Sequence, residues 1–367
     1  MMSPRVSPRR RPPPLFRRGP ALAALLVVVV LPSPGPGRQA SAASEEPPGS
    51  ATRLALRLDP LAELYFSTRA EAARDQAPSA GDDSPHAAAV AAARRIQVAL
   101  GAFGGWGPLD AEVFMVADAA ALRRRFEALP ETLRRGGREI AIRVDAVEWA
   151  RALEAAFPDF LERSWPERRA RLAALVAGLE TKFLPAHRRA LAFMMASLAI
   201  EDPGIEVPIV LVTECHPPGA STYHVDDGAP ASVLGAPALA ARGQLAETIL
   251  HEATHGLDIT SQGKGSAFAT LRALLEARGV GPRDRLYHDV PHTLMFVQAA
   301  ETMRRIYDPE HVPYGVSSDL YARSGAAAEV ERRIWPRFLD GELDRDEALR
   351  RIVDEIVPPP APAPPGS

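Results

Sequence analysis

The chain has 367 residues, of which 46% are hydrophobic and 24% are charged, and its formal net charge at pH 7 is −3. This balance excludes a disordered protein, and the lack of a long apolar run after residue 31 excludes a protein with several membrane-spanning helices. Cys215 is the only cysteine, so no intramolecular disulfide can form and the fold must be held by packing or by a bound metal.

The first 42 residues have the layout of a secretory signal peptide. They contain seven arginines and no acidic residue, with an apolar stretch from Ala21 to Leu31 and then the small residues Ala40-Ser41-Ala42. This order is typical of a cleaved export signal, and the apolar stretch is about half of the roughly 20 residues that span a bilayer. We therefore predict a secreted or periplasmic protein with no stable membrane span after cleavage; an uncleaved anchor is the alternative.

Cleavage after residue 42 would remove seven arginines and change the net charge from −3 to −10. A chain this acidic is a poor partner for phosphate backbones, so no nucleic-acid partner is expected. Prolines are concentrated at the ends, with 11 of the 36 in residues 1–50 and 6 in residues 358–367. We expect a flexible linker at 43–51, a single domain at 52–357 and a disordered proline-rich tail at 358–367.

Apolar patterns predict a mixed fold with many helices. Alternation predicts a half-buried strand at Thr52–Leu58, and runs of Val, Ile and Phe predict further strands at Ala111–Val116, Arg138–Val144 and Glu206–Thr213. Pro208 in the last strand favours an edge position. Apolar residues at three- and four-residue steps predict helices at 85–100, 118–129 (capped by Asp118), 166–183 and 185–200. The fold class is therefore α+β and helix-dominated, with a small mixed sheet.

The strongest chemical signal is QLAETILHEATHGLD, residues 244–258. His251 and His255 are four residues apart, so on a helix their imidazoles project from one face and can bind one metal ion. Glu252, rotated from His251 by about 100°, can reach a water molecule beside that metal. This H-E-x-x-H arrangement indicates a zinc hydrolase with Glu252 as general base. A buried helix surface is expected from Leu245, Ile249, Leu250, Ala253 and Leu257.

Through this motif, and through the strand-then-helix order of residues 206–258, the chain resembles the zincin clan of metallopeptidases. The resemblance implies Zn²⁺ as the cofactor, the two histidines as ligands and the glutamate between them as the base. It also implies a peptide or protein substrate, held in extended form by the edge strand of a mixed sheet. The domain at 52–357 would then be a zincin-like catalytic domain, with the edge strand within residues 218–235.

A catalytic zinc needs a third protein ligand and an open position for water. The metzincin pattern places Gly three residues after the second histidine and a ligand six residues after it, but this chain has Asp258 and Ser261 there. The gluzincin pattern takes a Glu from a second helix, and the candidate here is Glu301, 46 residues after the second histidine. Arg305 stands where that pattern often carries Asp.

Two other interpretations of this second helix stay open. His292 ends the sequence HDVPH at the predicted start of the helix, directly after Pro291, and is the alternative third ligand. Because nine residues separate it from Glu301, the two lie on roughly opposite sides of a regular helix and are not expected to bind one ion. His292 could instead contact the substrate. Glu301 could simply pair with Arg304 or Arg305.

Further side chains of the site are indicated less strongly. Asp258, about one turn beyond His255, is a candidate acceptor for a hydrogen bond from a ligand imidazole, or a solvated residue near the helix end. Stabilising the transition state needs a donor near the developing oxyanion. The sequence leaves five candidates for that donor, namely Tyr223, His224, His311, Tyr314 and Tyr321.

These patterns together predict an exported zinc-dependent peptidase that hydrolyses peptide bonds with metal-activated water and Glu252 as general base. One alternative is a metal-stabilised binding or scaffold protein that cleaves nothing. Another is a zinc hydrolase that acts on a non-peptide amide or ester, because the same residues would serve that reaction equally well.

Overall fold

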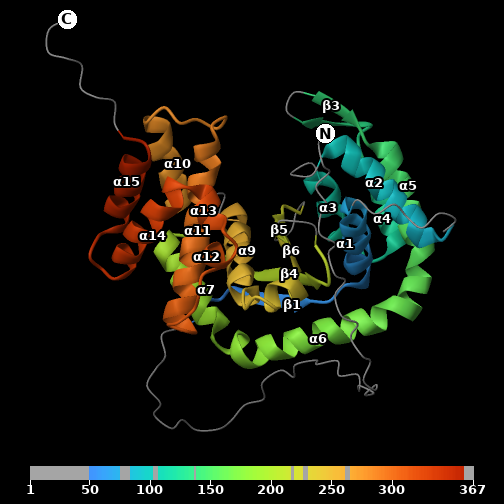
Figure 1. Ribbon diagram of the computed structural model, residues 1–367, viewed down its shortest axis with the longest axis horizontal. Helices are drawn as coiled ribbons and strands as arrows, with labels where there is room; N and C mark the ends of the chain where they lie inside the picture. The colour runs from blue at the N-terminus through green and yellow to red at the C-terminus, as the bar shows by residue number, and fades with distance from the viewer. Residues whose placement is uncertain are drawn as a thin grey trace, which may run out of the picture. The chain divides into compact units, whose positions relative to one another are not determined.

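In this computed structural model, all described residues belong to the unit formed by residues 44–367. The predicted signal peptide lies outside the described residues, as do all but three residues of the predicted linker and all but one of the predicted tail. Across the described chain, no helix combines the length and the apolar character needed to cross a membrane. The structure (Figure 1) describes residues 49–74, 83–101, 106–135, 138–215, 219–225, 230–260 and 265–358.

A four-stranded mixed sheet lies at the centre of this unit. Three strands are parallel, and the fourth, β5, pairs antiparallel with β6 at one edge. The predicted strands at Thr52–Leu58 and Glu206–Thr213 are confirmed as β1 and β4, and the segment 218–235 contains the edge strand β5. Across the sheet the order is β1 (Arg53–Arg57), β4 (Glu206–Val212), β6 (Ala231–Gly235) and β5 (Ala220–Tyr223).

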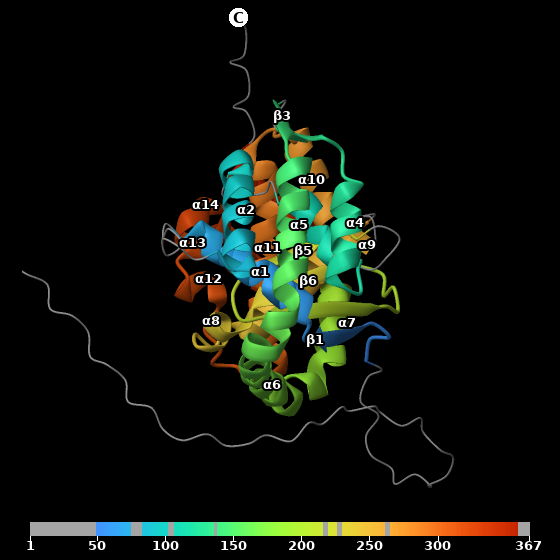
Figure 2. The ribbon, with the colours of Figure 1, turned by 90° about the vertical axis from the view of Figure 1, so that its right-hand side faces the viewer.

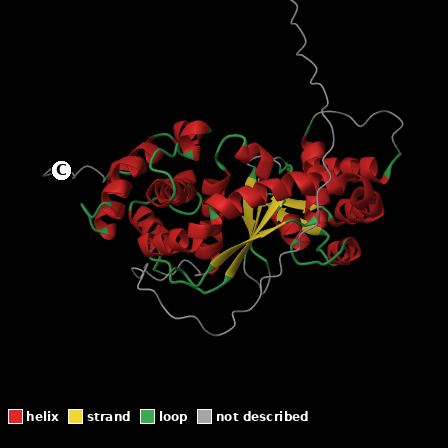
Figure 3. Cartoon of the chain, turned by 90° about the horizontal axis from the view of Figure 1, so that it is seen from below, coloured by secondary structure: helices red, strands yellow, loops and turns green. Residues whose placement is uncertain are grey.

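Both faces of the sheet are buried, as alternate residues of β4 show. Val207, Ile209 and Leu211 belong to one hydrophobic cluster, and Val210 and Val212 belong to the other. Figure 3 shows the strands with helices on both sides. The first cluster includes side chains from α7 (His187–Leu198), α9 (Leu245–Thr260) and α11 (Arg285–Ile306), and the second includes side chains from α1 (Pro60–Ala73), α2 (Pro85–Leu100) and α5 (Arg143–Asp159).

The predicted helices are confirmed as α2, α4 (Ala119–Glu127), α6 (Trp165–Lys182) and α7. Asp118 caps α4 by accepting a hydrogen bond of 2.7 Å from the backbone N–H of Ala121. A π-helical turn joins α5 to α6, which runs below the sheet in Figure 1, and Figure 2 shows α2, α4 and α5 in front of β5 and β6. The remaining helices are α3 (Gly107–Val113), η1 (Phe160–Ser164), η2 (Leu184–Ala186), α8 (Ala236–Ala240), α10 (Ala267–Ala277), α12 (Tyr314–Ser317), α13 (Leu320–Ser324), α14 (Ala326–Leu339) and α15 (Arg345–Ile356).

Two of the predicted strands are wrong in whole or in part. Ala111–Val116 is not a strand, because α3 covers residues 107–113 and buries Leu109 and Val113, four residues apart as on a helix. Arg138–Val144 is only partly extended: β3 (Arg138–Ala141) pairs with β2 (Thr132–Arg135) in a separate hairpin, and α5 begins at Arg143. Short apolar runs fit either a strand or a buried helical turn, so periodicity alone does not separate them.

The expectation that Pro208 marks an edge strand is also wrong, because β4 lies between β1 and β6. The register explains how a proline is tolerated in an interior strand. Pro208 is paired with Ala55 of β1, whereas pairing with β6 begins only at the next residue, Ile209. At Pro208 the strand therefore has a neighbour on one side only, and no ladder bond to β6 is lost there.

A buried carboxylate, Asp110 of α3, ties the edge strand to the helices behind it. The hydroxyl groups of Tyr65 and Tyr223 each donate a 2.9 Å hydrogen bond to it, and Arg69 forms an ion pair with it. The side chain of Arg69 is 9% exposed and that of Asp110 is 1% exposed. Since Tyr223 is the last residue of β5, this cluster holds the end of the strand that borders the candidate site.

Replacing Asp110 should destabilise the protein strongly. In Asp110→Ala the buried guanidinium of Arg69 loses its counter-charge, and breaking such a pair costs about 3–5 kcal/mol. Denaturant titration would measure the free energy of unfolding. Asp145→Ala is the matched control, because its pair with Arg95 is solvent-exposed and such pairs contribute about 0–1 kcal/mol. Equal effects of the two substitutions would contradict this account.

Glu331 of α14 is a second buried carboxylate, and it is unpaired. It is 0% exposed, and neither carboxylate oxygen has a hydrogen-bond partner among the described residues. Burial raises the pKa of Glu331 well above its usual value of 4.5. The folded state therefore binds this proton more tightly than the unfolded state, so Glu331 stabilises the fold below pH 4.5 and this contribution is lost as the pH rises toward the folded-state pKa.

We expect Glu331→Met to raise the free energy of unfolding at pH 7 by about 1–3 kcal/mol, because an unsatisfied buried polar group is removed. The gain should shrink as the pH falls toward 4.5, because the wild-type carboxyl stays protonated in the folded state and becomes increasingly protonated in the unfolded state. Denaturant titrations between pH 4.5 and 8 would measure both effects. Glu329→Met, an exposed position on the same helix, should show neither. A destabilised Glu331→Met at pH 7 would refute the prediction.

Candidate metal centre

Helix α9 buries one side against the sheet. The five residues predicted to form its buried surface, from Leu245 to Leu257, are each at most 5% exposed. The helix contacts β4, β5, β6 and α11. Gly256 permits this close approach, because a Cβ atom there would lie 3.0 Å from Cγ of Pro230 and 3.6 Å from Cγ1 of Val207. The helix that carries the H-E-x-x-H residues is therefore fixed against the strands.

Three imidazoles converge beside this helix. The Nε2 atoms of His251 and His255 are 3.1 Å apart, and the two ring centroids are separated by 4.7 Å. His292 of α11 completes the group, with its ring centroid 5.1 Å from that of His251 and 5.2 Å from that of His255. One ring nitrogen from each residue lies within 4.8 Å of the other two. In the part of the chain that the structure describes, this is the one group of three such side chains able to hold a metal ion.

The three imidazoles are kept neutral. Burial is the main cause for His251, whose pKa lies well below its usual range, and for His255, whose pKa is lowered to about 3. Loss of hydration among the surrounding side chains also lowers the pKa of His292. The charge that each neighbour would carry lowers the first two pKa values further. Neutral imidazoles offer nitrogen lone pairs, and metal ligands must be deprotonated. The donor set therefore fits Zn²⁺ or another metal that accepts imidazole nitrogen.

His292 lies on the solvent side of this cluster. It is exposed, His255 is half-buried and His251 is buried. Helix α11 begins at Arg285, earlier than the sequence indicated, because Asp284 caps it with a 2.9 Å hydrogen bond from Leu286 N–H. Pro291 therefore lies inside the helix and not in its first turn. The cluster is open on the side of His292, where water or a substrate can enter.

Glu301, the third ligand favoured by the sequence, lies away from the three imidazoles. Its carboxylate Oε1 is 2.9 Å from an NH group of Arg304, and Oε2 is 3.5 Å from Nε of Arg305. This is the ion pairing that the sequence left open as the alternative. Nine residues separate Glu301 from His292, so the two side chains lie on roughly opposite sides of α11. His292 faces α9, and Glu301 faces the two arginines.

Glu252, the candidate base, is held by the edge strand. The hydroxyl of Thr222 in β5 donates a 2.7 Å hydrogen bond to Glu252 Oε2 and lies 2.8 Å from the hydroxyl of Ser232 in β6. Burial raises the pKa of the Glu252 carboxyl to about 7, although the bond from Thr222 opposes this. The sequence did not single out Thr222. Its only signal was membership of the segment predicted to contain the edge strand.

These residues line a cavity of about 240 Å³. Its walls come from α9, α11, β5, Leu239 of α8 and the start of α12. The aromatic ring of Phe296 stacks on that of His251 with centroids 3.6 Å apart. Tyr314 continues the stack, with its ring 5.5 Å from that of Phe296. Phe296, like Thr222, was not indicated by the sequence. The cavity is therefore bordered by the three histidines, Glu252, Thr222, Phe296 and Tyr314.

Of the five candidate oxyanion donors, only Tyr314 lines this cavity in the described structure. The other four are placed elsewhere: Tyr223 donates to Asp110, His311 contacts Glu247, Tyr321 is buried under the guanidinium of Arg332, and His224 is an exposed residue after β5.

Asp258 lies at the far end of α9. It accepts a 3.2 Å hydrogen bond from the hydroxyl of Ser266, and its other oxygen is 3.6 Å from Arg272. The positive charge of Arg272 contributes to the lowered pKa of His255. Nδ1 of His251 is buried and has no hydrogen-bond partner within the described residues, so Asp258 does not orient that ring.

No model of a known protein family, no curated protein and no solved structure matches this chain. The chemistry of the site must therefore be argued from its own geometry.

The two candidates for the third ligand can be separated by metal content. We expect wild-type protein to bind about one zinc per chain and His292→Ala to lose most of it, because two imidazoles leave a tetrahedral ion without its third protein ligand. Glu301→Gln is the matched control and should keep its zinc, since it changes a residue outside the cluster. Elemental analysis after dialysis measures both. Zinc loss in Glu301→Gln with retention in His292→Ala would reverse the assignment.

Proposed function

We propose that this protein is a zinc-dependent hydrolase, and specifically a peptidase. The observation that carries the proposal is the convergence of His251, His255 and His292 beside Glu252 in a cavity open to solvent. Three protein nitrogens leave one position of a tetrahedral zinc for water or substrate, which distinguishes catalytic sites from closed structural ones. Bound zinc supplies a Lewis acid that lowers the pKa of water and polarises a carbonyl group.

Glu252 is the general base in this proposal. It directly follows His251 in the chain, and Thr222 engages its Oε2, so Oε1 is the oxygen left to accept a proton. Glu252 takes a proton from the attacking water as the new C–O bond forms, and it then delivers that proton to the leaving nitrogen as the C–N bond breaks. Tyr314 is the side chain that can donate to the carbonyl oxygen, because it lines the same cavity.

The edge strand favours a peptide over a small ester as the substrate. Ala220, Ser221 and Thr222 of β5 border the cavity, and among the described strands β5 is paired with β6 alone. An extended peptide could therefore add to the open edge of β5 through main-chain hydrogen bonds, with its scissile bond beside the histidines. This arrangement supports the resemblance to the zincin clan. A secreted or periplasmic location rests on residues 1–42 and belongs to the same proposal.

Glu252→Gln should lower the turnover of a peptide library by at least about 10²-fold, the contribution of a positioned general base, while the bound zinc is retained. Turnover is measured by mass spectrometry of the products and zinc by elemental analysis. A chelator should abolish wild-type activity and added zinc should restore it. Glu329→Gln, at an exposed position on α14, is the control and should have no effect.

Full turnover by Glu252→Gln would show that the mechanism is wrong. If the wild type binds one zinc and cleaves non-peptide amides or esters but no peptide, the protein is a zinc hydrolase with a different substrate. If it binds zinc and cleaves nothing, the protein is a metal-stabilised binding or scaffold protein.

A further inference from the structure

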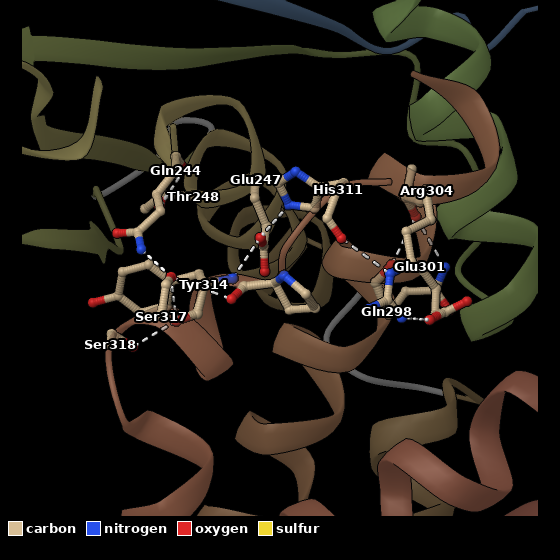
Figure 4. Close-up of polar contacts among 12 residues, drawn as sticks. Gln244, Glu247, Thr248, Gln298, Glu301, Arg304, His311, Tyr314, Ser317 and Ser318 are labelled. Carbon is tan, nitrogen blue, oxygen red and sulfur yellow. Dashed lines mark hydrogen bonds and ion pairs between the residues drawn. The ribbon is translucent and has the colours of Figure 1, made fainter. Parts of the chain in front are cut away.

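Glu247 is a buried carboxylate on the helix of the metal centre, one turn before His251. It is 1% exposed, and four residues separate it from His251, so both project from the same side of α9. Its Oε2 accepts a 2.6 Å bond from Nε2 of His311 and a 2.7 Å bond from the backbone N–H of Tyr314 (Figure 4). Burial of this acid costs folding free energy, because its Oε1 has no partner among the described residues.

These bonds hold the chain segment that leads into α12. In addition, the side chain of Gln244, just before α9, donates to the hydroxyl of Ser317 at the other end of α12. Side chains at the start of α9 thus form hydrogen bonds with both ends of α12, at Tyr314 and at Ser317. Figure 4 shows the two sets of contacts side by side along the helix.

Glu301 and Arg304 support this arrangement from the opposite side. Arg304 is paired with Glu301 at 2.9 Å and donates a 3.2 Å hydrogen bond to the carbonyl oxygen of His311. His311 is therefore held at its backbone by α11 and at its ring by α9. In the described structure Glu301 therefore contacts the arginine that holds the backbone of His311.

The segment held in this way closes one side of the metal centre. The ring of Tyr314 stacks on Phe296, which stacks on His251. Tyr314 and Leu239 also border a second cavity of about 620 Å³, which reaches Gly219, the residue before β5. Tyr314 therefore borders both the cavity of the three histidines and a larger one beside it.

We propose that Glu247 is a positioning residue, which fixes Tyr314 as the wall between the metal centre and the neighbouring cavity. The proposal rests on the proposed function for its consequence in turnover, because a misplaced wall would misalign the substrate. A displacement of about 1 Å is enough to lower a rate about 10²-fold. The position of Tyr314 itself can be tested without any turnover.

The test is ¹⁹F NMR of protein labelled with fluorotyrosine and loaded with Co²⁺ in place of zinc. The chain has six tyrosines, and Tyr314→Phe identifies the resonance of Tyr314. In the wild type, paramagnetic Co²⁺ should broaden or shift that resonance strongly. In Glu247→Ala this effect should be largely lost while one Co²⁺ stays bound. Glu247→Gln keeps an oxygen that accepts both hydrogen bonds, so it should restore the effect.

Two further variants serve as controls for the cobalt effect on Tyr314. Gly315→Ala displaces the same segment without changing Glu247, because a Cβ atom there would overlap the ring of Tyr321, and it should also weaken the cobalt effect. Asp202→Ala removes a carboxylate that likewise accepts hydrogen bonds from backbone N–H groups, those of Ala51 and Thr52, but borders neither cavity. It should leave the cobalt effect intact.

With a cleaved peptide as substrate, Glu247→Ala should lower kcat/KM by roughly 10- to 100-fold, and Glu247→Gln should recover most of it. An unchanged cobalt effect on Tyr314 in Glu247→Ala, in the assay in which Gly315→Ala weakens it, would overturn the positioning role, even if the wild type is an active peptidase. If the wild type cleaves nothing but Glu247→Ala releases Tyr314 from the cobalt, the positioning role stands and the proposed function fails. A wild type that binds no Co²⁺ would overturn both.

Discussion

The packing of α9 between the sheet and α11 is the constraint on which the candidate centre depends. The apolar side of α9 is buried, and Gly256 brings the helix against Val207 and Pro230. Helical spacing alone places His251 beside His255. Only the contact with α11 adds His292, and the stacking of Phe296 on His251 belongs to the same interface. Apolar burial and convergence of the imidazoles are thus two results of one packing arrangement.

Two buried carboxylates hold the walls of the cavity. Asp110 receives hydrogen bonds from two tyrosines and an ion pair from Arg69, and so fixes β5, whose Thr222 contacts Glu252. Glu247 accepts two hydrogen bonds and fixes the start of α12. Burying charge is unfavourable unless it is paired, so each carboxylate specifies the partners that must surround it. Both walls are therefore held by polar contacts at defined positions within an apolar core.

Local patterns predicted the helices well and the strands less well. The helices at 85–100 and 166–183 have apolar steps sustained over several turns, and this periodicity has one structural solution. Residues 111–116 form too short a run to show a period, and Val113, the one buried residue among them, lies in the last turn of α3, a helix that contacts α1 and β5. Pro208 misled for a related reason, because its tolerance depended on where β6 begins.

The sequence by itself determined the fold class and the local geometry of the H-E-x-x-H helix, because the 3.6-residue repeat decides which side chains share a face. It also showed that His292 and Glu301 lie on opposite sides of one helix. Only the tertiary structure decided which of those sides meets α9, since 37 residues separate His255 from His292 and periodicity does not specify which helices touch. The contacts of Thr222 with Glu252 and of Glu247 with Tyr314 likewise exist only because distant segments pack together.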